Sequence, residues 1–268
     1  MNQAVVLARG LGTRMRKADA AAPLSASQAA AAATGVKAMI PLDRPFLDYV
    51  LAVVAEAGYE RVCLVVGPQH AQVREYYAKL RPQRLAIEFA IQQDPLGTAD
   101  AVAAAEKFAL GKPFLVINSD NHYPLDALQA LRDGMGPAGV VFDPDVLLAQ
   151  SNIPAERISR FAVVETDAAS CLCRVLEKPD EATLARLPPP LGISMNCWRL
   201  TPAIFEACRS IGPSPRGELE LPDAVQYAID RLGERFRVIW CKSPVLDLSS
   251  RSDIEPVARR LAGVKVQL

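Results

Sequence analysis

The segment "AVVLARGLGTRMRK" (residues 4–17) joins a short apolar run to a loop rich in glycine and basic side chains. An apolar run of this length without polar alternation is typical of a strand covered on both faces. Glycines after such a strand allow backbone N–H groups to approach an anion, Thr13 adds a hydroxyl, and Arg14 offers a forked donor for phosphate oxygens. A plain turn with a solvated basic patch has the same pattern. The loop alone therefore leaves phosphate binding and a simple turn equally open.

Two well-known nucleotide motifs are incomplete in this loop. The spacing Gly10-x-Gly12 begins the dinucleotide pattern GxGxxG, but Met15 occupies the position of the third glycine. The triphosphate-binding pattern GxxxxGK[ST] is absent from the sequence. A dinucleotide-dependent oxidoreductase is therefore disfavoured.

The first half of the chain alternates short apolar runs with longer helical patterns. Strands are expected at 4–8, 61–67, 85–92 and 113–120, and helices at 46–59, around 70–80 and at 97–109. Helices interleaved with such strands predict an open α/β sheet, doubly wound and Rossmann-like. Because these sheets bind ligands at the carboxyl ends of their strands, the loops after Ala8, Gln92 and Ser119 are expected to line one crevice.

The pattern changes after residue 120. Strands are expected at 138–144, 161–167, 171–179, 191–200 and 236–242, and helices near 201–209, at 218–233 and from about 252. Consecutive strands without an intervening helix predict an antiparallel portion within a mixed sheet. We expect one domain over 1–268, with 1–125 mainly binding nucleotide and 126–255 mainly binding the acceptor. The Ala-rich segment 18–34 is expected to be a flexible loop, with a short helix after Pro23 as the alternative.

Composition narrows the function further. The chain has 30 Lys and Arg against 30 Asp and Glu, so no net charge attracts nucleic acid or an anionic membrane. No apolar stretch is long enough to span a bilayer. Six cysteines without CxxC spacing are typical of reduced thiols, which predicts a cytoplasmic protein. With two histidines, a His/Cys zinc site or a Ser-His-Asp triad is improbable.

Seven short motifs occur in the order expected of one family. They are "LARGLGTRMRK" (7–17), "GVKAMIPL" (35–42), "QQDPLGTADAV" (92–102), "NSD" (118–120), "LEKP" (176–179), "GELELPDA" (217–224) and "VLD" (245–247). Together they resemble the sugar-1-phosphate nucleotidyltransferases, the NDP-sugar pyrophosphorylases, from about residue 4 to 255. The resemblance implies a nucleotidyltransferase-type fold with an inserted antiparallel sugar-binding portion. It also resolves the ambiguity of the first loop in favour of triphosphate binding.

The resemblance implies a reaction and three catalytic cations. In this family an oxygen of a sugar 1-phosphate attacks the α-phosphorus of an NTP, and pyrophosphate leaves. Arg14 resembles the loop arginine that holds the triphosphate, Lys37 the lysine at the α-phosphate, and Lys178 the residue that binds the sugar phosphate. No general base is required, because the attacking phosphate is already ionised.

The same resemblance assigns the remaining site residues. The nucleotide would contact Leu7, Gly10, Gly12, Thr13, Gln92, Gly97 and Thr98, where the amide of Gln92 mildly favours UTP or dTTP. The sugar would contact Glu177, Ala162 and Gly192. The family's Mg²⁺ is held by two aspartates, which correspond to Asp120 and Asp247. Arg9 stands where the family usually has a small residue.

Several alternatives remain open from the sequence. The enzyme could use another base or acceptor, such as GTP with mannose- or heptose-1-phosphate or CTP with phosphocholine. It could also be a catalytically weak regulatory homologue. The expected partners are the NTP and the sugar 1-phosphate, without nucleic acid or membrane, and a homo-oligomer is possible.

Overall fold

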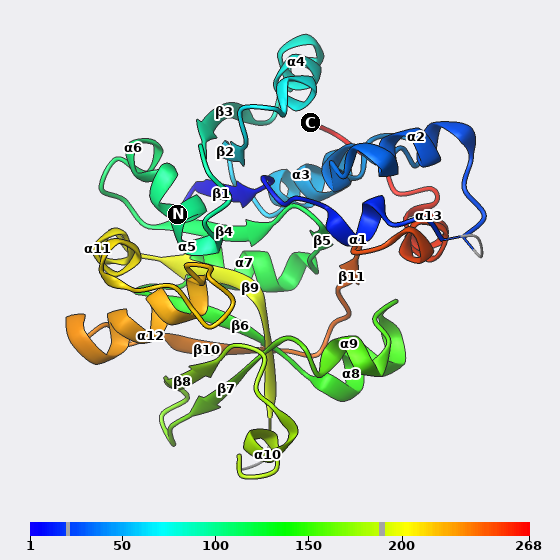
Figure 1. Cartoon of the computed structure of the whole chain (residues 1–268). Helices are drawn as coiled ribbons and strands as arrows, with labels where there is room; N and C mark the ends of the chain where they lie inside the picture. Colours follow the sequence, from blue (N-terminus) through cyan, green and yellow to red (C-terminus); the bar gives the residue numbers. More distant parts are fainter. Residues whose placement is uncertain (20–21, 188–190) are drawn as a thin grey trace.

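The structure is a computed structural model that describes residues 1–268 except 20–21 and 188–190. A mixed sheet runs through the molecule (Figure 1). Within the described part of the chain, nine strands form the sheet, with the main order β10-β6-β9-β4-β1-β2-β3 and β7 and β8 attached through β9. Their bounds are β1 (Gln3–Leu7), β2 (Arg61–Val66), β3 (Ala86–Ile91), β4 (Phe114–Asn118), β6 (Ala138–Phe142), β7 (Ala162–Thr166), β8 (Leu172–Leu176), β9 (Gly192–Leu200) and β10 (Arg237–Cys241). A two-stranded sheet pairs β5 (Asn121–His122) with β11 (Leu246–Asp247).

The direction of pairing changes where the sequence pattern changes. Strands β1, β2, β3 and β4 are parallel to one another. Strand β9 then runs antiparallel to β4, β6 and β7, and β7 is antiparallel to β8. The predicted doubly wound sheet with an antiparallel portion is confirmed.

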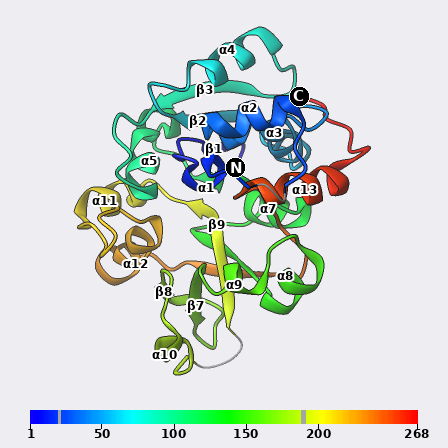
Figure 2. The same ribbon diagram turned by 45° about the vertical axis from the view of Figure 1, so that its right-hand side comes forward.

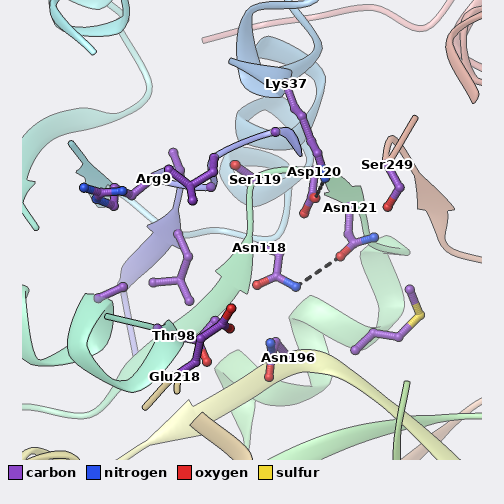
Figure 3. A pocket seen from close by; sticks show the side chains of 18 of the residues that line it. Arg9, Lys37, Thr98, Asn118, Ser119, Asp120, Asn121, Asn196, Glu218 and Ser249 are labelled. Atoms are coloured by element: carbon purple, nitrogen blue, oxygen red, sulfur yellow. Dashed lines mark hydrogen bonds and ion pairs between the residues drawn. The ribbon is translucent and has the colours of Figure 1, made fainter. Parts of the chain in front are cut away.

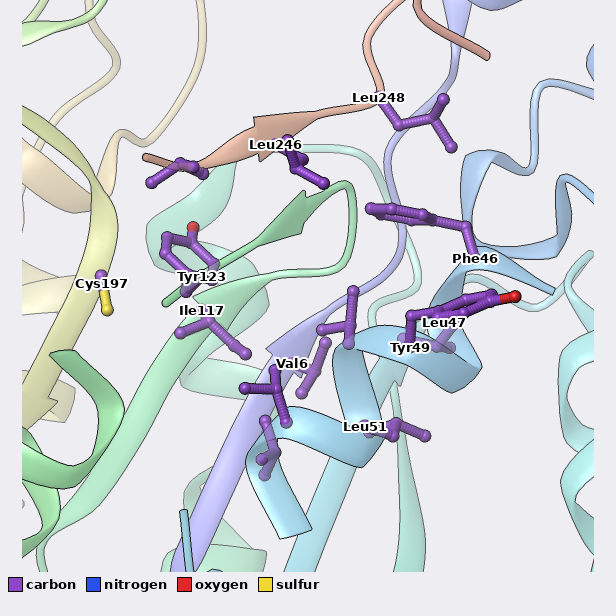
Figure 4. Close-up of a cluster of buried hydrophobic side chains, with 14 of the residues drawn as sticks. Val6, Phe46, Leu47, Tyr49, Leu51, Ile117, Tyr123, Cys197, Leu246 and Leu248 are labelled. Atoms are coloured by element: carbon purple, nitrogen blue, oxygen red, sulfur yellow. The ribbon is translucent and has the colours of Figure 1, made fainter. Parts of the chain in front are cut away.

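Both faces of β1, β2 and β4 are buried, as the unbroken apolar runs predict, whereas the edge strand β3 is partly exposed. Along β1, Val5 and Leu7 belong to one hydrophobic core, whereas Ala4, Val6 and Ala8 belong to the other. The first core packs under α5 (Thr98–Ala104), α6 (Glu106–Ala109), α11 (Ala203–Ser210) and α12 (Leu221–Leu232). The second packs under α3 (Phe46–Glu56) and α7 (Leu125–Asp133), where α3 is apolar on almost every side (Figure 4).

Several elements differ from the expectations. The helix expected over 97–109 is divided at Ala105 into α5 and α6. Between the strands expected at 138–144 and 161–167 the structure has α8 (Pro144–Gln150) and α9 (Ala155–Ile158), so the expectation of uninterrupted strands there was wrong. Both helices begin beside a proline, whose fixed φ suits the start of a helix. The helices are too short to show a helical repeat of apolar residues in the sequence.

The flexible loop expected over 18–34 is largely a helix, α2 (Ala26–Thr34), as the alternative had it. Ser25 and Gln28 form a reciprocal capping box at its start, and Gly35 ends it in the left-handed conformation with φ 78°. The segment contains five consecutive alanines, and alanine has the highest helix propensity of the amino acids. This propensity outweighs the preference of the nearby Ser and Pro residues for a loop. Residues 20–21 lie outside the described part of the chain.

Shorter elements complete the chain around this frame (Figure 2). They are α1 (Thr13–Arg16), η1 (Lys37–Met39), α4 (Ala71–Leu80), α10 (Glu181–Leu184), η2 (Arg251–Asp253) and α13 (Ile254–Leu261). Among the described helices, none has the length and apolar character that crossing a membrane requires.

Candidate functional site

A cavity of about 510 Å³ opens along the carboxyl ends of the parallel strands and extends to β7 and β9. Ala8, Gln92 and Ser119 all line it, so the three loops expected to share one crevice do so. Thirteen of the expected site residues also line it: Leu7, Gly10, Gly12, Thr13, Arg14, Lys37, Gln92, Gly97, Thr98, Asp120, Ala162, Glu177 and Lys178. Asp247 and Gly192 are the two that do not.

The glycine loop brings two distant segments together. Gly12 has φ 61°, and a Cβ on it would collide with the backbone of Gly35. This close approach places the segment after Gly35, including Lys37, beside the loop that carries Arg14. Met15 is fully buried in the core, which explains why the third glycine of a dinucleotide motif is not needed here.

Lys37 and Asp120 meet at the centre of the cavity (Figure 3). Lys37 Nζ lies 2.7 Å from Asp120 Oδ2, and both side chains are about three-quarters or more buried, with exposures of 19% and 26%. Asp120 follows β4 by two residues, which is the position at which a parallel sheet presents side chains to a ligand. In the described part of the chain, Asp120 Oδ1 has no hydrogen-bond partner.

Asp247 lies behind the cavity wall. Its Oδ1 accepts hydrogen bonds from Asn121 Nδ2 at 3.0 Å and from Ser249 Oγ at 3.1 Å, and both of these residues line the cavity. Its Oδ2 pairs with Arg157 Nη1 at 2.7 Å. Burial raises the pKa of Asp247, and the negative charge of Asp120 raises it further. The two carboxylates are therefore close enough to repel one another.

The donor set of these two aspartates fits a divalent cation. A cation between them would relieve their repulsion, and Mg²⁺ in proteins commonly takes one or two carboxylates with phosphate and water oxygens. The described residues contain no group of three or more acidic, His or Cys side chains arranged to hold a metal ion, so the remaining ligands would come from substrate or water. Lys37 and Arg157 balance the two charges in the structure itself.

Charged side chains gather at the acceptor end of the cavity. Lys178 Nζ lies 3.3 Å from Glu177 Oε1, and Arg216 Nη1 lies 2.9 Å from Glu220 Oε1. Burial raises the pKa of Glu177, and the charge of Lys178 opposes that rise. Lys178 has φ 44°, a left-handed conformation that is uncommon for a residue with a side chain and typical of functional sites.

Ala162 and Gly192 have different surroundings although both were expected to face the sugar. Ala162 lines the cavity. A Cβ on Gly192 would instead collide with Val141 and press on the ring of Trp240. Gly192 is therefore closely packed between strands, and it is not among the residues that line the cavity.

The end of the cavity near Gln92 and Gly97 has several internal hydrogen bonds. Gln92 is buried, and its Nε2 donates to Gly97 O at 3.0 Å and to Asp100 Oδ2 at 2.8 Å. Gly97 has φ 126°, and a Cβ there would collide with the backbone of Leu219. Thr98 Oγ1 accepts from the backbone N–H of the first residue of α12 at 2.8 Å. This end is thus rigid before any ligand binds.

Sequence reasoning missed Arg157 and Ser194 and gave Arg9 no binding role. Arg157 belongs to a four-residue helix whose "AERI" pattern is typical of a solvated surface. Arg9 Nη1 and Ser194 Oγ are buried, and neither has a hydrogen-bond partner in the described part of the chain. Both residues line the cavity. Unpaired buried polar atoms of this kind mark places where a ligand can supply the partner.

Comparison with known proteins agrees with this arrangement. A family model described as nucleotidyl transferase matches residues 3–240. The UTP–glucose-1-phosphate uridylyltransferase AglF of Haloferax volcanii is 27% identical over 97% of this chain and 96% of its own length. A glucose-1-phosphate thymidylyltransferase of Streptomyces antibioticus is 33% identical over 85% of this chain. The chain spans 57% of that second relative.

Solved structures share the fold at low sequence identity. A crystal structure of UDP-glucose pyrophosphorylase complexed with UDP-glucose superposes with a TM-score of 0.76. The match covers 99% of this chain and 100% of the other at 19% identity. It therefore supports the architecture described above.

Proposed function

The chain belongs to the nucleotidyl transferase family, and we propose that it transfers a nucleoside monophosphate from an NTP to a sugar 1-phosphate. The observation that carries the proposal is the convergence of Arg14, Lys37 and Lys178 on one cavity from three segments far apart in sequence. Three cations around one space suit two anionic substrates that repel each other. We further propose UTP or dTTP as the NTP, in line with the names of the two relatives.

The bond changes are simple. An oxygen of the sugar 1-phosphate forms a bond to the α-phosphorus as the bond from that phosphorus to the bridging oxygen of the β-phosphate breaks. Pyrophosphate leaves with the electron pair, and the NDP-sugar remains. Because the reacting groups are ionised, the protein contributes charge neutralisation and alignment, with no proton transfer required.

Each cation has a place in this scheme. Arg14, at the start of α1, would hold the β- and γ-phosphates and favour the departure of pyrophosphate. Lys37 would shift from Asp120 to the α-phosphate when the nucleotide enters. Lys178 would bind the phosphate of the acceptor while Glu177 accepts hydrogen bonds from its hydroxyls.

We propose Mg²⁺ as the cofactor, held by Asp120 and Asp247. When bound, the ion would neutralise phosphate charge and hold the α-phosphate in the geometry of attack. The residues of this chain would then serve as supports: Asn121 and Ser249 orient the carboxylate of Asp247, and Arg157 fixes its second oxygen.

Asp120→Ala tests this assignment. Pyrophosphate release from UTP and glucose 1-phosphate should fall at least about a hundredfold, because one of the two carboxylates and the anchor of Lys37 are lost. Asp133→Ala is the matched control, since this aspartate is 66% exposed and pairs only with its neighbour Arg132. Circular dichroism and thermal melting should be unchanged in both variants.

A screen of UTP, dTTP, CTP, GTP and ATP against several sugar phosphates accompanies the variant. Pyrophosphate release that survives Asp120→Ala in a buffer containing chelator would contradict the metal assignment. Absence of release for every pair with the unmodified chain would contradict the transfer itself.

A further inference from the structure

Arg9 carries a buried donor that the protein does not use. The residue is only 7% exposed and directly follows Ala8 at the end of β1. Its Nε donates to the backbone oxygen of Gln92 at 3.3 Å, and its Nη2 donates to that of Gln93 at 3.1 Å. In the part of the chain that the structure describes, Nη1 has no partner although it is buried. A guanidinium is always charged, so leaving one of its nitrogens unpaired is costly unless a ligand completes it.

Neither His70 nor Asp100 pairs with Arg9 Nη1. His70 is buried nearby, and its Nδ1 already accepts from the backbone N–H of Gly67 at 3.2 Å. Burial lowers the pKa of His70, and the charge of Arg9 lowers it further, so the ring is neutral at pH 7 and its other nitrogen is a donor. Asp100 lies at the same end of the cavity but accepts from Gln92. No ion pair forms between Arg9 and a carboxylate in the described residues.

Arg9 lies apart from the phosphate-binding cations. Figure 3 shows its guanidinium on one side of Ser119, with Lys37 and Asp120 on the other. It lines the cavity together with Gln92 and Gly97, the pair assigned to the base. Its bonds to the backbone oxygens of Gln92 and Gln93 therefore place the guanidinium nearer the end assigned to the base than to Lys37 and Asp120.

Gln92 cannot supply a donor to the base in this arrangement. Its Nε2 has two N–H bonds, and both are taken, by Gly97 O and by Asp100 Oδ2. Since both partners are acceptors, the amide orientation is fixed with Oε1 as the atom left over. At this end Arg9 Nη1 is a charged side-chain donor that is buried without a partner in the described residues.

We propose that Arg9 determines nucleobase specificity: its Nη1 donates to the C4 carbonyl oxygen of uracil or thymine and thereby favours UTP and dTTP over CTP. The inference rests on the proposed nucleotidyl transfer and specifies its nucleotide. Cytosine has the same ring with an amino group at C4. That amino group is a hydrogen-bond donor and would face the donor Arg9 Nη1. A buried charged donor left unpaired is a strong source of discrimination.

The test compares Arg9→Met with Arg74→Met. Arg74 is the matched control because its guanidinium also donates to two backbone oxygens, those of Gly67 and Pro68 at 3.1 Å each, but it does not line the cavity. Dissociation constants for UTP and CTP are measured by calorimetry, and kcat/KM by pyrophosphate release with glucose 1-phosphate. Arg9→Met should weaken UTP about ten- to a hundredfold and CTP less than about threefold. Arg74→Met should keep the UTP preference of the unmodified chain.

Each outcome decides the inference. A UTP-to-CTP ratio that Arg9→Met leaves unchanged, or an unmodified chain that prefers CTP, would overturn it. If circular dichroism shows that Arg9→Met does not fold, Arg9→Ala decides in the same way, since a small residue is usual at this position in the family and has no side-chain donor. An Arg9-dependent preference in binding without any pyrophosphate release would leave this inference standing and refute the proposed transfer. Failure to bind either nucleotide would refute both.

Discussion

Arg157 should stabilise the fold far more than an exposed arginine with the same contact distance. Its Nη1 lies 2.7 Å from Asp247 Oδ2 and 3.0 Å from Asp253 Oδ1, and the three side chains are only 15%, 4% and 6% exposed. Removing one partner of a buried ion pair costs about 3–5 kcal/mol, because the remaining charge is left in a medium that solvates it poorly. The substitution Arg157→Gln keeps much of the volume and removes the charge.

The loss in stability should lie near the lower end of that range, because both carboxylates keep other hydrogen bonds when Arg157 is replaced. Asp253 Oδ2 would still accept from the backbone N–H groups of Ser249 and Ser250 and from Ser250 Oγ. Asp247 would keep both bonds to Oδ1 but lose the partner of Oδ2. One uncompensated oxygen gives a loss of about 3 kcal/mol in the free energy of unfolding. For a chain of this size that is a fall of roughly 6–12 °C in melting temperature.

Urea unfolding monitored by circular dichroism measures this loss. Arg259→Gln is the control, because Arg259 pairs with Glu255 at the same 2.7 Å but the two side chains are 71% and 48% exposed. The control should lose less than about 1 kcal/mol. In the double variant with Asp247→Asn, much of the cost of Arg157→Gln should disappear, because residue 247 no longer carries a charge and Asp253 keeps the three hydrogen bonds to its Oδ2. Equal losses for Arg157→Gln and Arg259→Gln, with additive effects in the double variant, would refute the reasoning.

Two further predictions concern packing and pH. Gly192→Ala should lower the free energy of unfolding by about 1–3 kcal/mol, since the added methyl meets Val141 and Trp240, while KM for glucose 1-phosphate stays within about twofold; a rise in KM without loss of stability would restore the sugar role. Burial lowers the pKa of His70, so near pH 6 this residue binds a proton in the unfolded chain but not in the folded chain. The free energy of unfolding should therefore fall as the pH drops below about 6.5, by up to about 1.4 kcal/mol per pH unit for this group. His70→Asn should reduce that slope in urea titrations at pH 7.5 and 5.5, leaving the part due to His122, whose pKa burial lowers to about 4, and an unchanged slope would contradict the prediction.

The parallel half of the fold follows directly from the sequence. Strands β1, β2 and β4 are runs of mainly apolar residues that are buried on both faces, whereas the edge strand β3 is partly exposed. The strands expected at 61–67 and 113–120 appear as β2 and β4 with only their ends shifted. Helices α8 and α9 could not be predicted in the same way, because seven and four residues are too few to establish a helical period.

The cations of the site were found through the resemblance, but their mutual geometry was not. That Gly12 touches Gly35, and so brings Lys37 to Arg14, depends on two backbone conformations that a residue pattern does not specify. The role of Gly192 likewise depends on which strand lies opposite, because glycine at a sugar and glycine under a tryptophan are identical in the sequence.

Substitution at a functional position carries information that the motif itself lacks. Arg9 departs from the small residue usual at the end of β1, and from the sequence alone that departure only lowers the expected nucleotide affinity. In the structure the same side chain is buried, holds the backbone of Gln92 and Gln93, and has one nitrogen left over. Both N–H bonds of the Gln92 amide are taken by Gly97 and Asp100, so under the proposal Arg9 provides the side-chain donor for the base. The proposal thus links the donor that Gln92 lacks for a ligand to the donor that Arg9 has, and this link is visible only in the hydrogen-bond partners of the two side chains.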